Sequence, residues 1–230
     1  MKFCVFDAYG TLFDVNAPAR KLTKEKSIKD FSKVWSIVSA RWREKQLSYT
    51  WLMNSMKEYK DFWSITEDAL DYALELTNFN KTPELKDKLL KFYRELDCFP
   101  EVPKVLRELK DLGIGTAILS NGTKKMINSA VMASDIGNQI DAIFSVEDVF
   151  VFKPDPRVYN MVTDKLSLKK SEILLISSNC WDISGAANFG FNTFWVNRNQ
   201  LPVDRLPAKP HFVGKDLFSV RVHLDKQFRH

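Results

Sequence analysis

Apolar residues are arranged along the chain in two patterns. Short apolar runs, of the length of buried strands, lie at residues 2–6, 116–119, 142–146, 173–176 and 193–196. Segments with apolar residues three and four positions apart separate the later runs. Of these predicted helices, residues 100–112 are the clearest, with Pro100 at the start and Gly113 after the end. This alternation of strands and helices predicts a parallel sheet in an α/β fold.

The segment between the first two runs has a different pattern. From residue 17 to about residue 95 the helical spacing continues, and no strand pattern interrupts it. We therefore expect a Rossmann-like α/β core domain made of residues 1–14 and 96–230. An all-helical cap domain, residues 15–95, is inserted after the first strand. Residues 201–210 contain three prolines and predict a loop, followed by an edge strand at residues 211–213.

Composition narrows the class of protein and its location. The chain has 230 residues, of which 45% are hydrophobic and 27% charged, as in ordinary globular proteins. No apolar run approaches the roughly 18 residues that a membrane span needs, and the N-terminus lacks the pattern of a signal peptide. Three widely spaced cysteines fit a reducing compartment. We expect a cytoplasmic protein without membrane contact.

The net charge of +5 raises the question of a nucleic-acid partner. Basic and acidic residues are interleaved along residues 21–33 and 81–110, which is typical of solvated helix faces. Nucleic-acid binding requires a clustered basic face instead. We therefore expect no nucleic-acid partner.

Polar residues follow several of the predicted strands, at the edge of a parallel sheet where ligands bind. They are Asp7, Ser120, Asn121, Ser177, Ser178, Asn179 and Asp182. Lys153 precedes Pro154, which we expect to open the next helix. Each residue alone has a simpler explanation, such as a helix cap, a turn or a solvated side chain. Their convergence under a helical lid predicts an active site.

These residues lie in motifs that resemble those of a known family. Residues 6–12, FDAYGTL, resemble the opening motif of the haloacid dehalogenase superfamily. Residues 42–51, WREKQLSYTW, look like the cap segment that carries the halide-binding arginine of the L-2-haloacid dehalogenases. Residues 119–122, 153–159 and 177–182 resemble the remaining motifs, in the family's order. The resemblance extends from residue 1 to about residue 198.

The resemblance implies an (S)-2-haloacid dehalogenase, a hydrolase of carbon–halide bonds. It would convert short L-2-haloalkanoic acids to D-2-hydroxy acids with inversion at C2, through an ester on Asp7, without a cofactor or a metal. The catalytic residues that it implies are Asp7, Thr11, Arg43, Lys153, Tyr159, Ser177, Asn179 and Asp182. The substrate-binding residues are Ala8, Tyr9, Arg43, Leu47, Phe62, Ser120, Asn121 and Trp181.

The implied roles divide between the two reaction partners. Lys153 would orient Asp7, while Thr11 and Tyr159 would tie the nucleophile loop and Lys153 together. Arg43 would meet the halide with help from Asn121. The substrate carboxylate would bind Ser120 and the backbone amides of residues 8, 9 and 121.

The remaining roles concern the wall of the site and the second step. An apolar wall that excludes water would come from Leu47, Phe62 and Trp181. Water would attack the aspartyl carbonyl, positioned by Ser177, Asn179 and Asp182.

Two alternatives remain open. A metal-dependent phosphatase of the same superfamily has a second Asp where this chain has Tyr9, and a metal-ligating carboxylate where it has Asn179. A noncatalytic binder of small carboxylates is also compatible with the fold.

Glu44, next to Arg43, departs from the neutral amide of some relatives. The resemblance also suggests a homodimer, for which Trp42, Trp51 and Trp63 offer apolar surface, although their spacing fits a plain core equally well.

Overall fold

The central feature of the computed structural model, which describes residues 1–24 and 30–228, is a six-stranded sheet. All neighbouring strands pair in parallel, in the order β3-β2-β1-β4-β5-β6. The strands are β1 (Phe3–Phe6), β2 (Gly115–Ser120), β3 (Ala142–Ser145), β4 (Ile173–Ser177), β5 (Asn192–Val196) and β6 (Phe212–Gly214). The predicted parallel sheet is therefore confirmed, including its edge strand, which begins one residue later than predicted.

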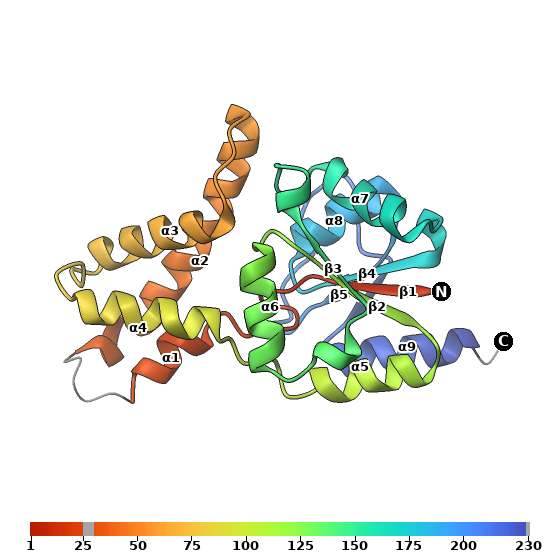
Figure 1. Ribbon diagram of the computed structural model, residues 1–230, viewed down its shortest axis with the longest axis horizontal. Coiled ribbons are helices and arrows are strands. Elements are labelled where there is room, and N and C mark those ends of the chain that lie inside the picture. The colour runs from red at the N-terminus through yellow and green to blue at the C-terminus, as the bar shows by residue number, and fades with distance from the viewer. Residues whose placement is uncertain (25–29, 229–230) are drawn as a thin grey trace.

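Among the described residues between β1 and residue 96, the chain forms four helices. They are α1 (Ala17–Leu22), α2 (Phe31–Met56), α3 (Phe62–Leu76) and α4 (Pro83–Arg94). Figure 1 shows them grouped to one side of the sheet. The described residues between 17 and 95 contain no strand, as the hydrophobic spacing predicted. Trp42 on α2 joins two of these helices by donating its indole N–H to the Thr66 carbonyl oxygen of α3 at 2.8 Å.

The remaining helices cover the sheet. They are α5 (Val102–Asp111), α6 (Lys124–Ala133), α7 (Pro156–Leu166), α8 (Cys180–Phe189) and α9 (Leu217–Phe228), with short 3-10 turns at Gly137–Gln139, Val146–Asp148 and Lys170–Glu172. In Figure 1, α7 and α8 lie on one side of the strands and α5 and α9 on the other. This sheet between two layers of helices is the predicted Rossmann-like arrangement.

The start of α7 differs from the prediction that Pro154 opens the helix. The helix begins at Pro156, and the Asp155 side chain caps it by accepting the backbone N–H of Arg157 at 2.9 Å. Pro154 instead follows Lys153 through a cis peptide bond. Asp155 is the N-cap, and the next residue, Pro156, occupies the first helical position, where its missing N–H is not needed.

The chain leaves and re-enters the sheet region through two segments that lie side by side. Phe13 and Cys98 form an isolated antiparallel bridge. Backbone hydrogen bonds extend it on both sides: Asp14 donates to Asp97 at 3.0 Å, and Phe99 donates to Leu12 at 2.9 Å. The helical segment is thus attached through one paired stem close to residues 14 and 96, where the sequence predicted the domain boundaries.

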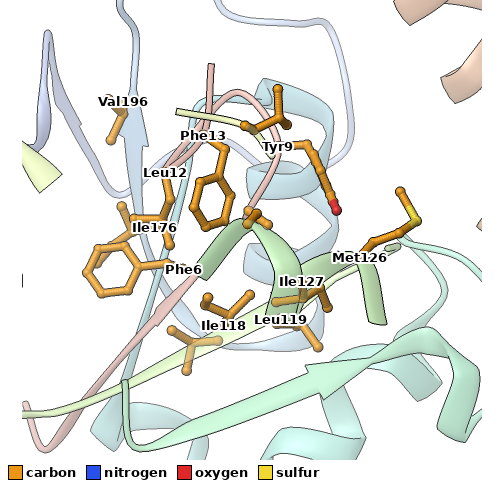
Figure 2. Packing of buried hydrophobic residues seen from close by; sticks show 14 of the residues in the cluster. Phe6, Tyr9, Leu12, Phe13, Ile118, Leu119, Met126, Ile127, Ile176 and Val196 are labelled. Atoms are coloured by element: carbon orange, nitrogen blue, oxygen red, sulfur yellow. The ribbon is translucent and has the colours of Figure 1, made fainter. Parts of the chain in front are cut away.

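The core of the sheet region lies directly beneath this stem. Figure 2 shows Phe6, Ile118 and Ile176 from three adjacent strands packed near Leu12 and Phe13 of the loop after β1. All five side chains are fully buried. Burying such side chains contributes roughly 1.5–3 kcal/mol each, so Leu12 and Phe13 anchor the loop that follows β1 in the core. Within residues 1–24 and 30–228, no helix is long and apolar enough to cross a bilayer.

Candidate active site

The candidate site begins at Asp7, which follows the central strand β1. Its backbone N–H donates to the Ile176 carbonyl oxygen of β4 at 2.9 Å, which fixes the residue to the neighbouring strand. The chain then turns at Gly10, whose φ of +90° suits glycine. A Cβ at Gly10 would also lie 3.2 Å from the Ser178 hydroxyl oxygen. This turn brings Thr11 back over the Asp7 carboxylate.

The Asp7 carboxylate is 7% exposed and held by four side chains. Its Oδ2 accepts hydrogen bonds from Thr11 Oγ1 at 2.9 Å, Asn179 Nδ2 at 2.8 Å and Ser177 Oγ at 3.5 Å. Its Oδ1 accepts from Lys153 Nζ at 3.2 Å. Thr11 also accepts the backbone N–H of Ser178 at 2.8 Å, so it joins the nucleophile loop to the end of β4. The predicted tie was to Lys153 instead.

Lys153 lies between two carboxylates. Its Nζ is 2.8 Å from Asp182 Oδ2, and its side chain is 1% exposed. Burial alone would lower the pKa of Lys153, but the charges of Asp182 and Asp7 outweigh burial and raise it above the ordinary value. The ammonium group is therefore charged at neutral pH.

Asp182 was expected to position water, but its carboxylate lies behind Lys153. One oxygen accepts from Lys153, and the other accepts from Tyr159 Oη at 2.8 Å. The side chain is fully buried and does not line the cavity. The water-positioning role of Asp182 stays a prediction, and its observed contacts are with Lys153 and Tyr159. Tyr159 reaches Lys153 only through this carboxylate.

Arg43 enters the site from α2 of the cap. Its Nη1 donates to Gln46 Oε1 at 2.8 Å and its Nη2 to the Tyr9 carbonyl oxygen at 3.2 Å. The neighbouring residue, Glu44, does not point toward Arg43 or the cavity. Its side chain is exposed and forms an ion pair with Arg41. The departure at Glu44 therefore lies outside the site.

A small cavity joins the predicted residues of the cap and the core. It is lined by Asp7, Tyr9, Arg43, Leu47, Phe62, Ser120, Asn121, Lys153, Asn179 and Trp181. Its volume of about 10 Å³ is near the lower limit for one water molecule. Every predicted substrate-binding residue except Ala8 lines this cavity.

The predicted residues that do not line the cavity have supporting positions. Ala8 is fully buried, and its carbonyl oxygen accepts the backbone N–H groups of residues 11, 12 and 13. Ser177 is also fully buried, and its Oγ accepts the Asn179 backbone N–H at 3.1 Å. Asn179 reaches both Asp7 and the cavity, and a contact of Ser177 with water stays a prediction.

The second strand end contributes two oriented side chains. Ser120 Oγ accepts the Gly122 backbone N–H at 3.0 Å, so its own proton can be donated elsewhere. Asn121 Oδ1 accepts the Lys153 backbone N–H at 2.9 Å. Because the amide oxygen is used in this way, the Nδ2 donor is the part of Asn121 available to the cavity.

Three residues of the site were missed by the sequence analysis: Gln46, Thr66 and Tyr93. Gln46 is 1% exposed and donates from Nε2 to Thr66 Oγ1 at 2.7 Å and Tyr93 Oη at 3.0 Å. Tyr93 stacks on Tyr9, with ring centroids 5.6 Å apart. The signal for Gln46 was present, since a polar residue lies one turn after Arg43 on the same helix face.

The described part of the chain contains no group of three or more His, Cys, Asp and Glu side chains that could hold a metal ion. Asn179 directs its amide Nδ2, a hydrogen-bond donor, at the Asp7 carboxylate at 2.8 Å.

Comparisons with known proteins agree with this geometry. The haloacid dehalogenase-like hydrolase model matches residues 1–190. (S)-2-haloacid dehalogenase 1 from Pseudomonas sp. strain CBS-3 is 42% identical, over 88% of this chain and 87% of that protein. The crystal structure of a dehalogenase has a TM-score of 0.92 at 35% identity and covers 97% of this chain and 96% of its own.

A further solved structure is that of the L-2-haloacid dehalogenase from Xanthobacter autotrophicus with chloropropionic acid covalently bound. It is 32% identical, has a TM-score of 0.85 and covers 98% of both chains. Since the family model spans most of the chain and these relatives match nearly its full length, the chain belongs to the (S)-2-haloacid dehalogenases of the haloacid dehalogenase-like hydrolases.

Proposed function

We propose that this chain hydrolyses short L-2-haloalkanoic acids to D-2-hydroxy acids, with Asp7 as the nucleophile. One observation carries the proposal: a carboxylate held by Thr11, Asn179 and Lys153 shares one cavity with the cap cation Arg43. A nucleophile and a cation on opposite sides of a small cavity suit a displacement in which an anion leaves. The covalently bound chloropropionic acid in the Xanthobacter enzyme supports the same chemistry.

In the first step, an Asp7 oxygen attacks C2 of the substrate. A C–O bond forms as the carbon–halogen bond breaks, and the halide leaves with the electron pair toward Arg43 and Asn121. Oδ2 is held by three donors, whereas Oδ1 accepts from Lys153 and retains a lone pair for attack. Attack opposite the halide inverts C2. Holding both partners in place supplies on the order of 7–11 kcal/mol in favourable cases.

In the second step, water attacks the carbonyl carbon of the Asp7 ester. The acyl C–O bond breaks, and the hydroxy acid leaves with one proton of the water. The other proton is released to solvent, so the Asp7 carboxylate is restored. C2 is not touched, so the inversion of the first step is retained. Asn179 is suited to orient this water, because its amide bonds to Asp7 and lines the cavity.

The substrate carboxylate is assigned to the loop side of the cavity. Ser120 has a hydroxyl proton available there, and the backbone amides of residues 8, 9 and 121 remain the proposed partners. Leu47, Phe62 and Trp181 supply the apolar wall, which excludes water from the first step.

The working unit is proposed to have two parts, with residues 1–14 and 96–230 as the core domain and residues 15–95 as the cap. The cavity between the two parts has room for about one water molecule, so admission of substrate is proposed to involve a rearrangement of its lining. A homodimer and a cytoplasmic location are also proposed. Trp42 is 3% exposed and offers no surface for a dimer, whereas Trp51 is 40% exposed. The free thiols of Cys4, Cys98 and Cys180 support a reducing compartment.

Chloride release from the separate enantiomers of 2-chloropropionate, with EDTA present, tests the proposed function. We expect release from the L enantiomer alone, with D-lactate as the organic product. No release from either enantiomer, together with magnesium-dependent hydrolysis of p-nitrophenyl phosphate, would support the phosphatase alternative.

A further inference from the structure

Gln46 lies behind Arg43, one helical turn further along α2. It is buried at 1% exposure and does not line the cavity, so it touches neither substrate nor nucleophile. Its Oε1 accepts Arg43 Nη1 at 2.8 Å, while the Tyr9 carbonyl oxygen accepts Nη2 at 3.2 Å. Two neutral acceptors therefore hold the guanidinium group.

The direction of the Gln46 amide is fixed by Thr66. The Thr66 hydroxyl donates its single proton to the Phe62 carbonyl oxygen at 2.7 Å, so toward Gln46 it can only accept. Gln46 Nε2 must then face Thr66, and Oε1 must face Arg43. If the Gln46 amide were flipped, its N–H groups would face the Arg43 cation, and the hydrogen bonds to Arg43 and Thr66 would both be lost.

The charge of the partner matters as much as its direction. Arg43 forms no ion pair with any carboxylate in residues 1–24 and 30–228, and its partners carry no formal charge. A buried carboxylate at the same place would form an ion pair with the guanidinium and reduce its attraction for a second anion. An amide holds Arg43 in place and leaves its full positive charge directed to the cavity.

We propose that Gln46 is a positioning residue that presents Arg43 to the leaving halide as an uncompensated cation. The inference rests on the proposed function, since it concerns the step in which halide departs. If Gln46 acts in this way, its loss should affect the departure of chloride more than that of bromide. Chloride is the poorer leaving group and needs more stabilisation than bromide, so the loss of the Arg43 charge should slow chloride departure more.

The test compares Gln46→Glu with wild type in single-turnover halide release from L-2-chloropropionate and L-2-bromopropionate. Losing a charge-assisted contact lowers a rate by about 10- to 100-fold. We expect a fall of that size for chloride and a smaller one for bromide, so that the bromide-to-chloride rate ratio rises about threefold or more. Gln200→Glu, the same change on an exposed loop residue, is the matched control and should leave the ratio unchanged.

If Gln46→Glu does not fold, Gln46→Met is the second variant for the same test. It keeps the shape of the side chain but removes its hydrogen bonds to Arg43 and Thr66. It should raise the ratio in the same direction, because Arg43 then lacks its acceptor. A purely structural role for Gln46 would lower both rates equally and leave the ratio at the wild-type value, which would overturn the inference. Inactivity of the wild type on both substrates would instead overturn the proposed function.

Discussion

At the scale of single residues, the account depends on how the polar atoms around Asp7 are satisfied. Its two oxygens accept four side-chain donors although the group is 7% exposed. A buried carboxylate without such partners would be expensive to ionise. The four donors therefore fix the direction of the lone pairs of the nucleophile.

Lys153 gives the first prediction at this scale. Lys153→Met leaves the Asp182 carboxylate buried without its cation, and breaking a buried pair from one side costs about 3–5 kcal/mol. We expect the free energy of unfolding in urea at pH 7 to fall by that amount. Lys165→Met, which breaks an exposed pair with Asp148, should cost less than about 1 kcal/mol. Equal losses in the two variants would contradict the buried role.

The difference in unfolding free energy between wild type and Lys153→Met depends on pH, because the pKa of Lys153 is raised in the folded state. A cation whose folded pKa is raised stabilises the fold fully below its unfolded pKa, and loses that effect as pH rises through the folded pKa. The ordinary value is 10.5. The gap in unfolding free energy between wild type and Lys153→Met should therefore stay constant from pH 7 to about 10 and narrow above that.

At the scale of secondary-structure elements, the site is an outcome of strand order. Asp7, Ser120 and Asn179 were predictable because each follows an apolar run, and parallel strands end at one edge of the sheet. The contacts of Gln46 with Thr66 and Tyr93 could not be predicted, because these partners are 20 and 47 residues away and no periodicity relates them. Only its place one turn after Arg43 could be read from the sequence. The place of Asp182 behind Lys153 was likewise set by packing between α7 and α8 rather than by spacing.

Helix α2 also contacts the core through Asn54. The Asn54 side chain donates to the Phe152 carbonyl oxygen at 2.7 Å and accepts the Phe152 backbone N–H at 2.9 Å. Asn54→Ala leaves both backbone groups next to Lys153 without partners, so we expect the free energy of unfolding to fall by about 1–3 kcal/mol. Urea denaturation measures this.

A suitable control is Asn128→Ala at an exposed position of α6, where a change within about 0.5 kcal/mol is typical of surface sites. If Asn54→Ala were no more destabilising than Asn128→Ala, the two hydrogen bonds to Phe152 would not stabilise the contact between α2 and the core.

At the scale of the whole molecule, the sequence pattern predicted the parallel sheet and the inserted helices, but not how the helices close over the sheet. Closure depends on contacts such as Asn54 with Phe152, and the ring contact between Trp51 and Trp181 with centroids 5.4 Å apart. These join residues 98 and 130 positions apart, and apolar spacing carries no information about such pairs. The closed arrangement brings Arg43 over Asp7.

The central claim is that Asp7 forms the ester and that water attacks its carbonyl carbon. A single turnover of L-2-chloropropionate in H₂¹⁸O, with enzyme in excess, separates the two possible fates of the label. The account predicts ¹⁸O in the peptide that contains Asp7, seen by mass spectrometry, and lactate without the label. Labelled lactate with an unlabelled Asp7 peptide would mean that water attacks C2 directly and would contradict the account.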